Sequence, residues 1–149
     1  MSPVHAAVGV AVLGLNLAAG VLGAWRWYRV EPSPRFWPLL RAGQAAVLVE
    51  ALDGGLLVLI GRHVASLHLL YGVLPLLVAF VAEGLRIGAA ESVLDGRGYA
   101  SAQEVGRQEP EEQRSVVRAI LRREMGVMTA SALVCVGLAA RAAFGAGGL

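Results

Sequence analysis

The sequence has 149 residues, of which 56% are hydrophobic and 16% are charged, and its formal net charge is +2. Soluble domains carry about 25% charged residues, and a chain of this length leaves too much surface in water to hide such an apolar excess. The composition therefore argues against a soluble domain and favours an integral membrane protein. A single cysteine, Cys135, excludes an internal disulfide and a cysteine-based zinc or iron–sulfur site.

The 13 lysine-or-arginine positions are all arginine, and alanine, glycine, valine and leucine dominate the rest of the chain. This bias is typical of a GC-rich bacterial genome. The arginines lie between apolar segments, which favours a role in membrane orientation over nucleic-acid binding. We therefore expect a multi-pass protein of the bacterial cytoplasmic membrane with no nucleic-acid partner.

Four segments are apolar over the length that a membrane-spanning helix needs, about 20 residues. They cover residues 4–25, 37–61, 64–85 and 125–144. The first segment resembles a signal peptide only in position, because it is too long and no basic residue precedes it. We predict an all-α integral membrane protein, with residues 1–149 forming a single four-helix bundle.

The segment between the third and fourth spans is polar but carries helix signals. Ser101 followed by Glu104 fits a capping box, and Pro110 suits the first turn of a further helix. We expect a helical cytoplasmic segment over about 87–124 that continues without a break into the fourth span.

Arginine content separates the two ends of the predicted bundle. Residues 26–41 carry four arginines and residues 86–123 carry seven, whereas the opposite end has only Arg62 and Arg141. Because arginine-rich loops stay in the cytoplasm, we expect both long connections to be cytoplasmic and both termini to lie outside. Aromatic residues typical of a membrane interface accompany the first connection: Trp25, Trp27, Tyr28 and Trp37.

Each span has a stripe of small or polar residues at helical spacing. Such stripes should face the other helices, because lipid supplies no hydrophobic drive for helix association. In chain order they are His5, Gly9, Val12, Asn16, Gly20 and Gly23; Gln44, Glu50, Asp53 and Gly54; His68, Gly72, Pro75, Ala79, Ala82 or Glu83, and Arg86; and Ser131, Cys135 and Arg141.

Two histidines near the outer ends of the first and third spans form a candidate cofactor site. His5 and His68 would be the axial ligands of a b-type haem, with Tyr71 and Arg141 bonding its propionates. A bound metal such as copper is an alternative, and interfacial polar residues without a ligand are another. His63 falls in the turn and is expected to face solvent.

Glu50 and Asp53 form a second candidate site, because a spacing of three puts them on one helix face. Counted along an upright helix at about 1.5 Å per residue, they lie about 16 Å and 12 Å from the outer end. An ionised acid inside the bilayer costs about 2.5–3.5 kcal/mol on insertion scales. The two acids would form an ion or proton site; the alternative is structural pairing of Asp53 with Arg141, or of Glu50 with Gln44 or Asn16.

The cytoplasmic segment carries a basic stripe in which Arg114, Arg118 and Arg122 repeat every four residues. Anionic lipid is the expected partner, at about 1 kcal/mol per basic residue near the surface. Acids of the same segment and a partner protein are the alternatives.

No nucleophile elbow, phosphate loop, HExxH or paired CxxC motif occurs in the sequence, which argues against a stand-alone enzyme with a soluble substrate. The expected role is a non-catalytic accessory subunit of a membrane complex, respiratory if haem is bound, in contact with the lipid bilayer and with a membrane-protein partner or a second copy. A small channel or transporter built on Glu50 and Asp53 is the first alternative. A purely structural or lipid-binding membrane protein is the second.

Overall fold

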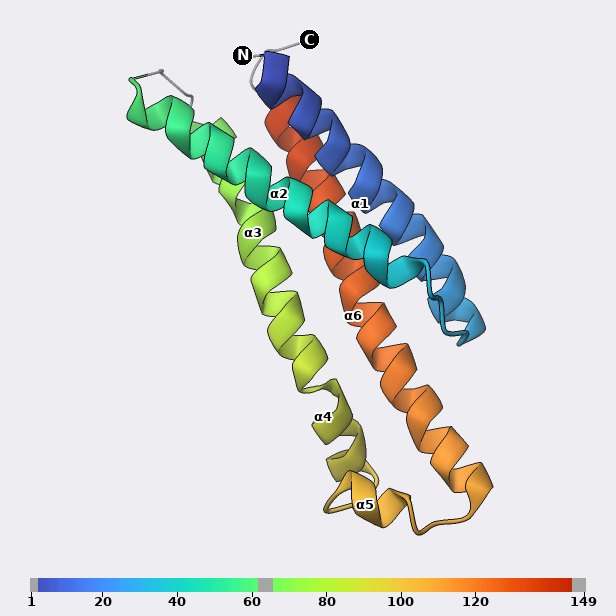
Figure 1. The fold of residues 1–149 in the computed structure, drawn as a ribbon. Coiled ribbons are helices and arrows are strands. Elements are labelled where there is room, and N and C mark those ends of the chain that lie inside the picture. The colour runs from blue at the N-terminus through green and yellow to red at the C-terminus, as the bar shows by residue number, and fades with distance from the viewer. Residues whose placement is uncertain (1–2, 62–65, 146–149) are drawn as a thin grey trace.

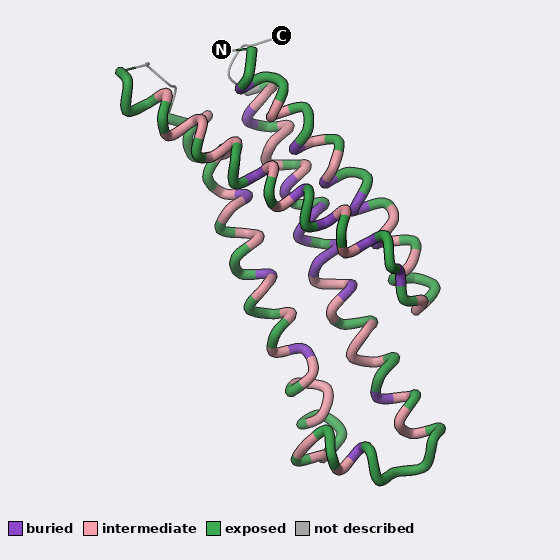
Figure 2. Tube along the Cα trace, in the orientation of Figure 1, coloured by how far each residue is buried: buried purple, intermediate pink, exposed green. Residues whose placement is uncertain are grey.

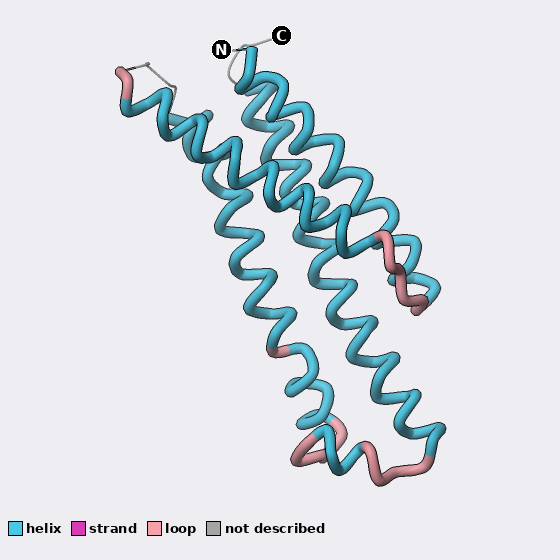
Figure 3. Tube along the Cα trace, viewed as in Figure 1, coloured by secondary structure: helices cyan, strands magenta, loops and turns pink. Residues whose placement is uncertain are grey.

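The computed structural model describes residues 3–61 and 66–145. These residues form six helices and no strand: α1 (Pro3–Arg29), α2 (Phe36–Leu59), α3 (Ser66–Ile87), α4 (Ala89–Gly96), α5 (Ala102–Val105) and α6 (Pro110–Gly145) (Figure 3). Four of them, α1, α2, α3 and α6, are long and apolar enough to cross a membrane. The prediction of an all-helical protein with four candidate spans is therefore confirmed. His63 lies outside the described residues.

Helix α6 is the centre of the bundle, since it packs along both α1 and α3. Helix α2 packs mainly on α1 and crosses α6 at an angle, so that its far end meets the start of α3 (Figure 1). The start of α1, the end of α2, the start of α3 and the end of α6 lie toward the same end of the bundle (Figure 1). We call this the terminal end of the bundle, and the opposite end, which carries α4 and α5, the arm end (Figure 1).

Small residues allow α1 to approach its neighbours closely. A Cβ atom built on Gly20 would lie 2.5 Å from the Leu133 side chain, and one on Gly23 would collide with Thr129 and Phe36. Both glycines are buried, as are the other predicted stripe residues of α1 except the half-buried Gly9. Close backbone approach of this kind replaces the hydrophobic drive that lipid does not supply.

The core lies where α1, α2 and α6 meet. Its fully buried large side chains are Phe36, Leu40, Met125 and Met128. Asn16 is also buried, and its side-chain amide donates to the backbone oxygens of Val12 and Gly43 at 2.9 Å and 3.3 Å. The amide thereby ties α1 to α2 with its N–H donors satisfied.

The arm end is an extension of α6 with α4 packed beside it. Helix α6 has 36 residues, which gives a length of about 54 Å, against about 30 Å for the hydrocarbon core of a bilayer. Its first part therefore projects beyond the span. Ser101 caps α5 by accepting from the Glu104 backbone N–H at 3.4 Å, and the Glu104 carboxylate accepts from the Ala100 N–H at 2.8 Å.

The outward faces of α2 and α3 are apolar and exposed over most of their length (Figure 2). Examples are Leu52, Leu56 and Leu59 on α2 and Leu77 and Phe80 on α3. Soluble monomers rarely expose contiguous apolar patches of more than a few hundred Å². Four apolar helices with such faces indicate a multi-pass membrane protein.

Candidate functional site

Four titratable side chains from three helices meet at the terminal end of the bundle. His5 of α1 lies between two carboxylates of α2: its Nδ1 is 2.9 Å from Asp53 Oδ2, and its Nε2 is 3.3 Å from Glu50 Oε1. The ring of His68, from α3, has its centroid 5.9 Å from that of His5. We call His5, Glu50, Asp53 and His68 the acid–histidine cluster.

Local sequence explains how these groups come together. Glu50 and Asp53 are one helical turn apart and therefore point to the same side of α2. Gly9 leaves room for the Glu50 carboxylate, since a Cβ there would lie 3.3 Å from Oε1, whereas a Cβ on Gly54 would lie at an ordinary contact distance of 3.6 Å from His5 Cε1. The His5 side chain between α1 and α2 is buried, with an exposed fraction of 6%.

The contacts of His5 bear on the charge of the cluster. A carboxylate oxygen and an imidazole nitrogen have only lone pairs unless one carries a proton, so the 2.9 Å hydrogen bond of His5 to Asp53 requires one proton, and the 3.3 Å contact of His5 with Glu50 is attractive only when it holds a second. With a proton in each contact, His5, Glu50 and Asp53 together carry a charge of −1, whichever atom holds each proton. One further proton or one cation would neutralise them.

His68 is oriented by α6. Its Nδ1 lies 3.1 Å from the backbone oxygen of Ala142, and because a carbonyl only accepts, Nδ1 must carry the proton. The hydrogen bond leaves Nε2 as the unprotonated ring nitrogen of neutral His68.

A cavity of about 460 Å³ lies against the cluster, and residues of all four spanning helices line it. His5, Glu50, His68 and Tyr71 are its titratable lining residues, and the other lining residues are alanine, glycine, proline and apolar side chains. Asp53 is not part of the lining and holds His5 from the other side. Volume and character match those of small-molecule sites, which are mostly apolar with a few converging polar groups.

The structure thus brings together some, but not all, of the predicted site residues. His5, His68, Glu50 and Tyr71 share the cavity, whereas Arg141 is exposed and stacks on Tyr71, with its guanidinium carbon 5.6 Å from the ring centroid.

Asp53 pairs with His5 and not with Arg141, and Glu50 also faces His5. The groups considered as partners of Glu50 bond elsewhere: Gln44 donates to Glu83 at 3.1 Å, and Asn16 bonds backbone oxygens. The sequence predicted the histidines and the acids as two separate sites, and the structure joins them.

Haem ligation by His5 would require a change in these contacts. Both of its ring nitrogens face carboxylates, so Nε2 would have to leave Glu50 before it could bind iron. Among residues 3–61 and 66–145, no three histidine, cysteine or acidic side chains are grouped so that they could hold a metal ion. The arrangement is suited to holding protons or a charge-complementary ligand.

A second charged cluster, which the sequence analysis did not identify, ties α2 to α3 nearer the arm end. The Glu83 carboxylate accepts from Arg41, from Gln44 and from Arg86, the last at 2.9 Å. The Arg86 guanidinium lies 5.9 Å from the Trp37 ring centroid. The sequence signal was present, since Glu83 and Arg86 are three residues apart on one span, but the contribution of Arg41 depends on how α2 crosses α3.

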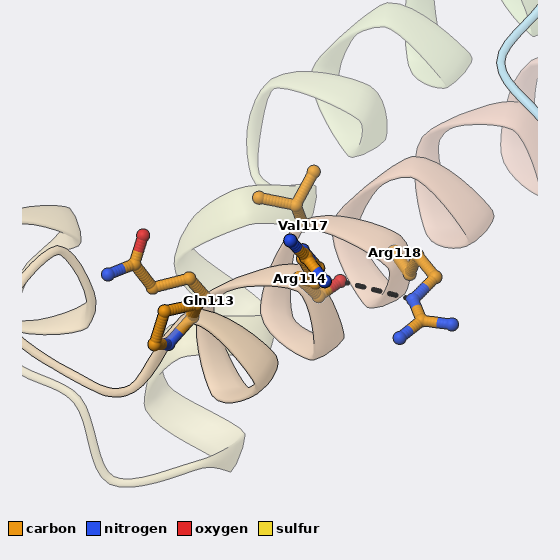
Figure 4. A pocket seen from close by; sticks show the side chains of 5 residues that line it. Gln113, Arg114, Val117 and Arg118 are labelled. Carbon is orange, nitrogen blue, oxygen red and sulfur yellow. Dashed lines mark hydrogen bonds between the residues drawn. The ribbon is translucent and has the colours of Figure 1, made fainter.

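The basic stripe of the arm divides into two parts. Arg122 stacks on Trp27 of α1 at 5.8 Å. Arg114 and Arg118 line an open hollow nearer the start of α6. There the Arg118 side chain donates to the Arg114 backbone oxygen at 3.3 Å (Figure 4). Arg114 lies about 12 Å closer to the N-terminal end of α6 than Arg122 does. Arg122 therefore contacts α1, whereas the side chain of Arg118 bonds the backbone of its own helix.

No protein family, curated protein or solved structure matches this chain.

Proposed function

We propose that this chain is a small transporter-type protein of the bacterial cytoplasmic membrane that takes up and releases a proton at the acid–histidine cluster. The observation that carries the proposal is the position of His5 between Glu50 and Asp53, beside a cavity. The protein has no catalytic role in this proposal: its chemistry is reversible protonation coupled to occupancy of the cavity.

The sharing of one imidazole, His5, by two carboxylates supports a functional cluster over a structural ion pair. A structural pair would match one acid with one base, whereas here two carboxylates share one imidazole. A residual charge of −1 inside a bilayer is costly, so the cluster gains stability whenever a proton or cation joins it. Groups with this property are functional candidates by default in membrane proteins.

The proposed orientation follows from the arginines. Eleven of the 13 arginines lie within residues 26–41, around the α1–α2 connection, or within residues 86–123, and such residues remain on the cytoplasmic side. Both termini and the acid–histidine cluster would then lie on the outer side, and α4, α5 and the start of α6 would form a cytoplasmic arm.

A pH titration followed by infrared difference spectroscopy on the detergent-purified protein tests the proposal. We expect a carboxylic acid band that grows on acidification and that is reduced in Glu50→Gln. Glu91→Gln is the matched control, because Glu91 is an exposed carboxylate of α4. The proposal is wrong if the spectra of wild type and Glu50→Gln respond to pH identically.

An accessory haem protein is the second candidate function, favoured by the 5.9 Å separation of the His5 and His68 rings at the cavity. A reduced-minus-oxidised absorption spectrum of protein expressed with ample haem decides it. Sharp α and β bands that vanish in His68→Ala would support haem, and a colourless folded protein would exclude it.

A further inference from the structure

We infer that the cavity binds a hydrophobic organic cation, such as a lipophilic amine or a quaternary ammonium or phosphonium ion, in exchange for the proton of the acid–histidine cluster. The inference rests on the proposed function and names the ligand class of the same site. It follows from the charge of the cavity, the character of its opening and an unused acceptor atom.

The cavity is electrostatically suited to a single positive charge. Among the described residues, no arginine lines it, while Glu50 does and Asp53 holds His5 from behind. The charge of −1 derived for His5, Glu50 and Asp53 is therefore not matched by an arginine of the cavity wall. His68, which also lines the cavity, is neutral when only its Nδ1 carries a proton. A monocation would neutralise it.

The opening of the cavity favours an apolar ligand over a hydrated metal ion. Val10, Leu69, Val73 and Phe144 line the cavity and are also exposed at the surface of the bundle. This rim faces lipid in a membrane. A hydrated ion would lose its water at such a rim without replacement ligands, whereas an organic cation would bury apolar surface as it enters.

Glu50 offers the acceptor for the charge. Its Oε1 faces His5, but its Oε2 is buried and has no hydrogen-bond donor among the described residues. A buried carboxylate oxygen without a donor is costly. An ammonium N–H or the diffuse charge of a quaternary ion placed beside Oε2 would compensate that cost.

Cation and proton should compete because both compensate the same charge. The titratable and charged groups around the cavity are His5, Glu50, Asp53, His68, Tyr71 and Arg141. Arg141 is exposed and stacks on Tyr71. If the cation displaces one proton from this set, its affinity rises with pH by up to about tenfold per pH unit.

Tetraphenylphosphonium is a suitable probe, because it carries a permanent charge and no proton. We would measure its binding to the detergent-purified full chain by equilibrium dialysis at two pH values one unit apart. We expect saturable binding that is tighter at the higher pH, and no competition by the neutral triphenylphosphine oxide. Glu50→Gln should weaken binding by about tenfold or more, as expected when a charge-assisted contact is removed, and Glu91→Gln should not.

A cavity-filling variant and its matched control test the cation site without changing the Glu50 carboxylate. Gly72 lines the cavity, and a Cβ there meets nothing within 4 Å, so Gly72→Leu should fill the cavity without unfolding the protein. Gly84→Leu is the matched control on the same helix, because Gly84 is exposed, equally unobstructed and not part of the lining. We expect loss of probe binding only in Gly72→Leu, with the infrared titration of Glu50 retained.

The outcomes separate the two proposals. A pH-dependent Glu50 band without saturable probe binding overturns the cation site and leaves proton uptake standing. Probe binding that is unchanged by pH, by Glu50→Gln and by Gly72→Leu would be nonspecific partitioning of the probe. This result would also overturn the cation site. Saturable, Gly72-sensitive binding without any Glu50 titration contradicts proton uptake and the exchange.

Discussion

The Nδ1 atom of His5 lies 2.9 Å from Oδ2 of Asp53, which joins the first turn of α1 to the second half of α2 across 48 residues of sequence. The contact is part-buried and lies beside a second acid, Glu50. It therefore contributes both to helix packing and to the charge of the cavity.

This contact predicts a measurable energetic coupling between the two side chains. His5→Ala, Asp53→Asn and the double variant form a cycle, and we expect a coupling of about 0.5–3 kcal/mol in the free energy of unfolding, the range for residues in direct contact. Unfolding by a denaturing detergent, followed by circular dichroism, measures it. Additive effects of the two substitutions would show that the pair contributes nothing to stability.

The four long helices and the inward-facing stripe of α1 could be predicted from the sequence, because both depend on the spacing of apolar, small and polar residues along one segment. Gly20 and Gly23 are buried against α6 and α2, as their period implied. The pairing of His5 with Asp53 could not be predicted, because it depends on the angle at which α2 crosses the bundle. Helix α2 runs obliquely to α1 and α6 (Figure 1), and Asp53 of this tilted helix lies 2.9 Å from His5.

The close approach of α1 to α6 predicts that Gly23 does not tolerate a larger side chain. Gly23→Val would drive its side chain into Thr129 and Phe36. We expect a loss of at least about 1–3 kcal/mol in the free energy of unfolding, the usual cost of overpacking. Gly14→Val on the same helix is the control, because a Cβ at Gly14 meets nothing within 4 Å. Equal stability of the two variants would contradict this packing.

The Glu83 cluster should stabilise the bundle without taking part in ligand binding. Glu83→Gln removes the charge that Arg41 and Arg86 share, and we expect a loss of about 1–2 kcal/mol, since these groups are partly solvated. Probe binding at the cavity should keep its affinity once the folded fraction is taken into account. A change in affinity similar to that of Glu50→Gln would show that the two clusters are coupled.

The proposed orientation predicts which engineered cysteines are accessible from outside the cell. Ser66→Cys is exposed at the terminal end and Ala102→Cys is exposed in α5 at the arm end, while the native Cys135 is buried. Because arginine-rich connections remain in the cytoplasm, a membrane-impermeant maleimide applied to intact cells should label Ser66→Cys and leave Ala102→Cys unlabelled. Permeabilised cells should label both, and wild type gives the background from Cys135. Labelling of Ala102→Cys in intact cells would invert the topology and move the acid–histidine cluster to the cytoplasmic side.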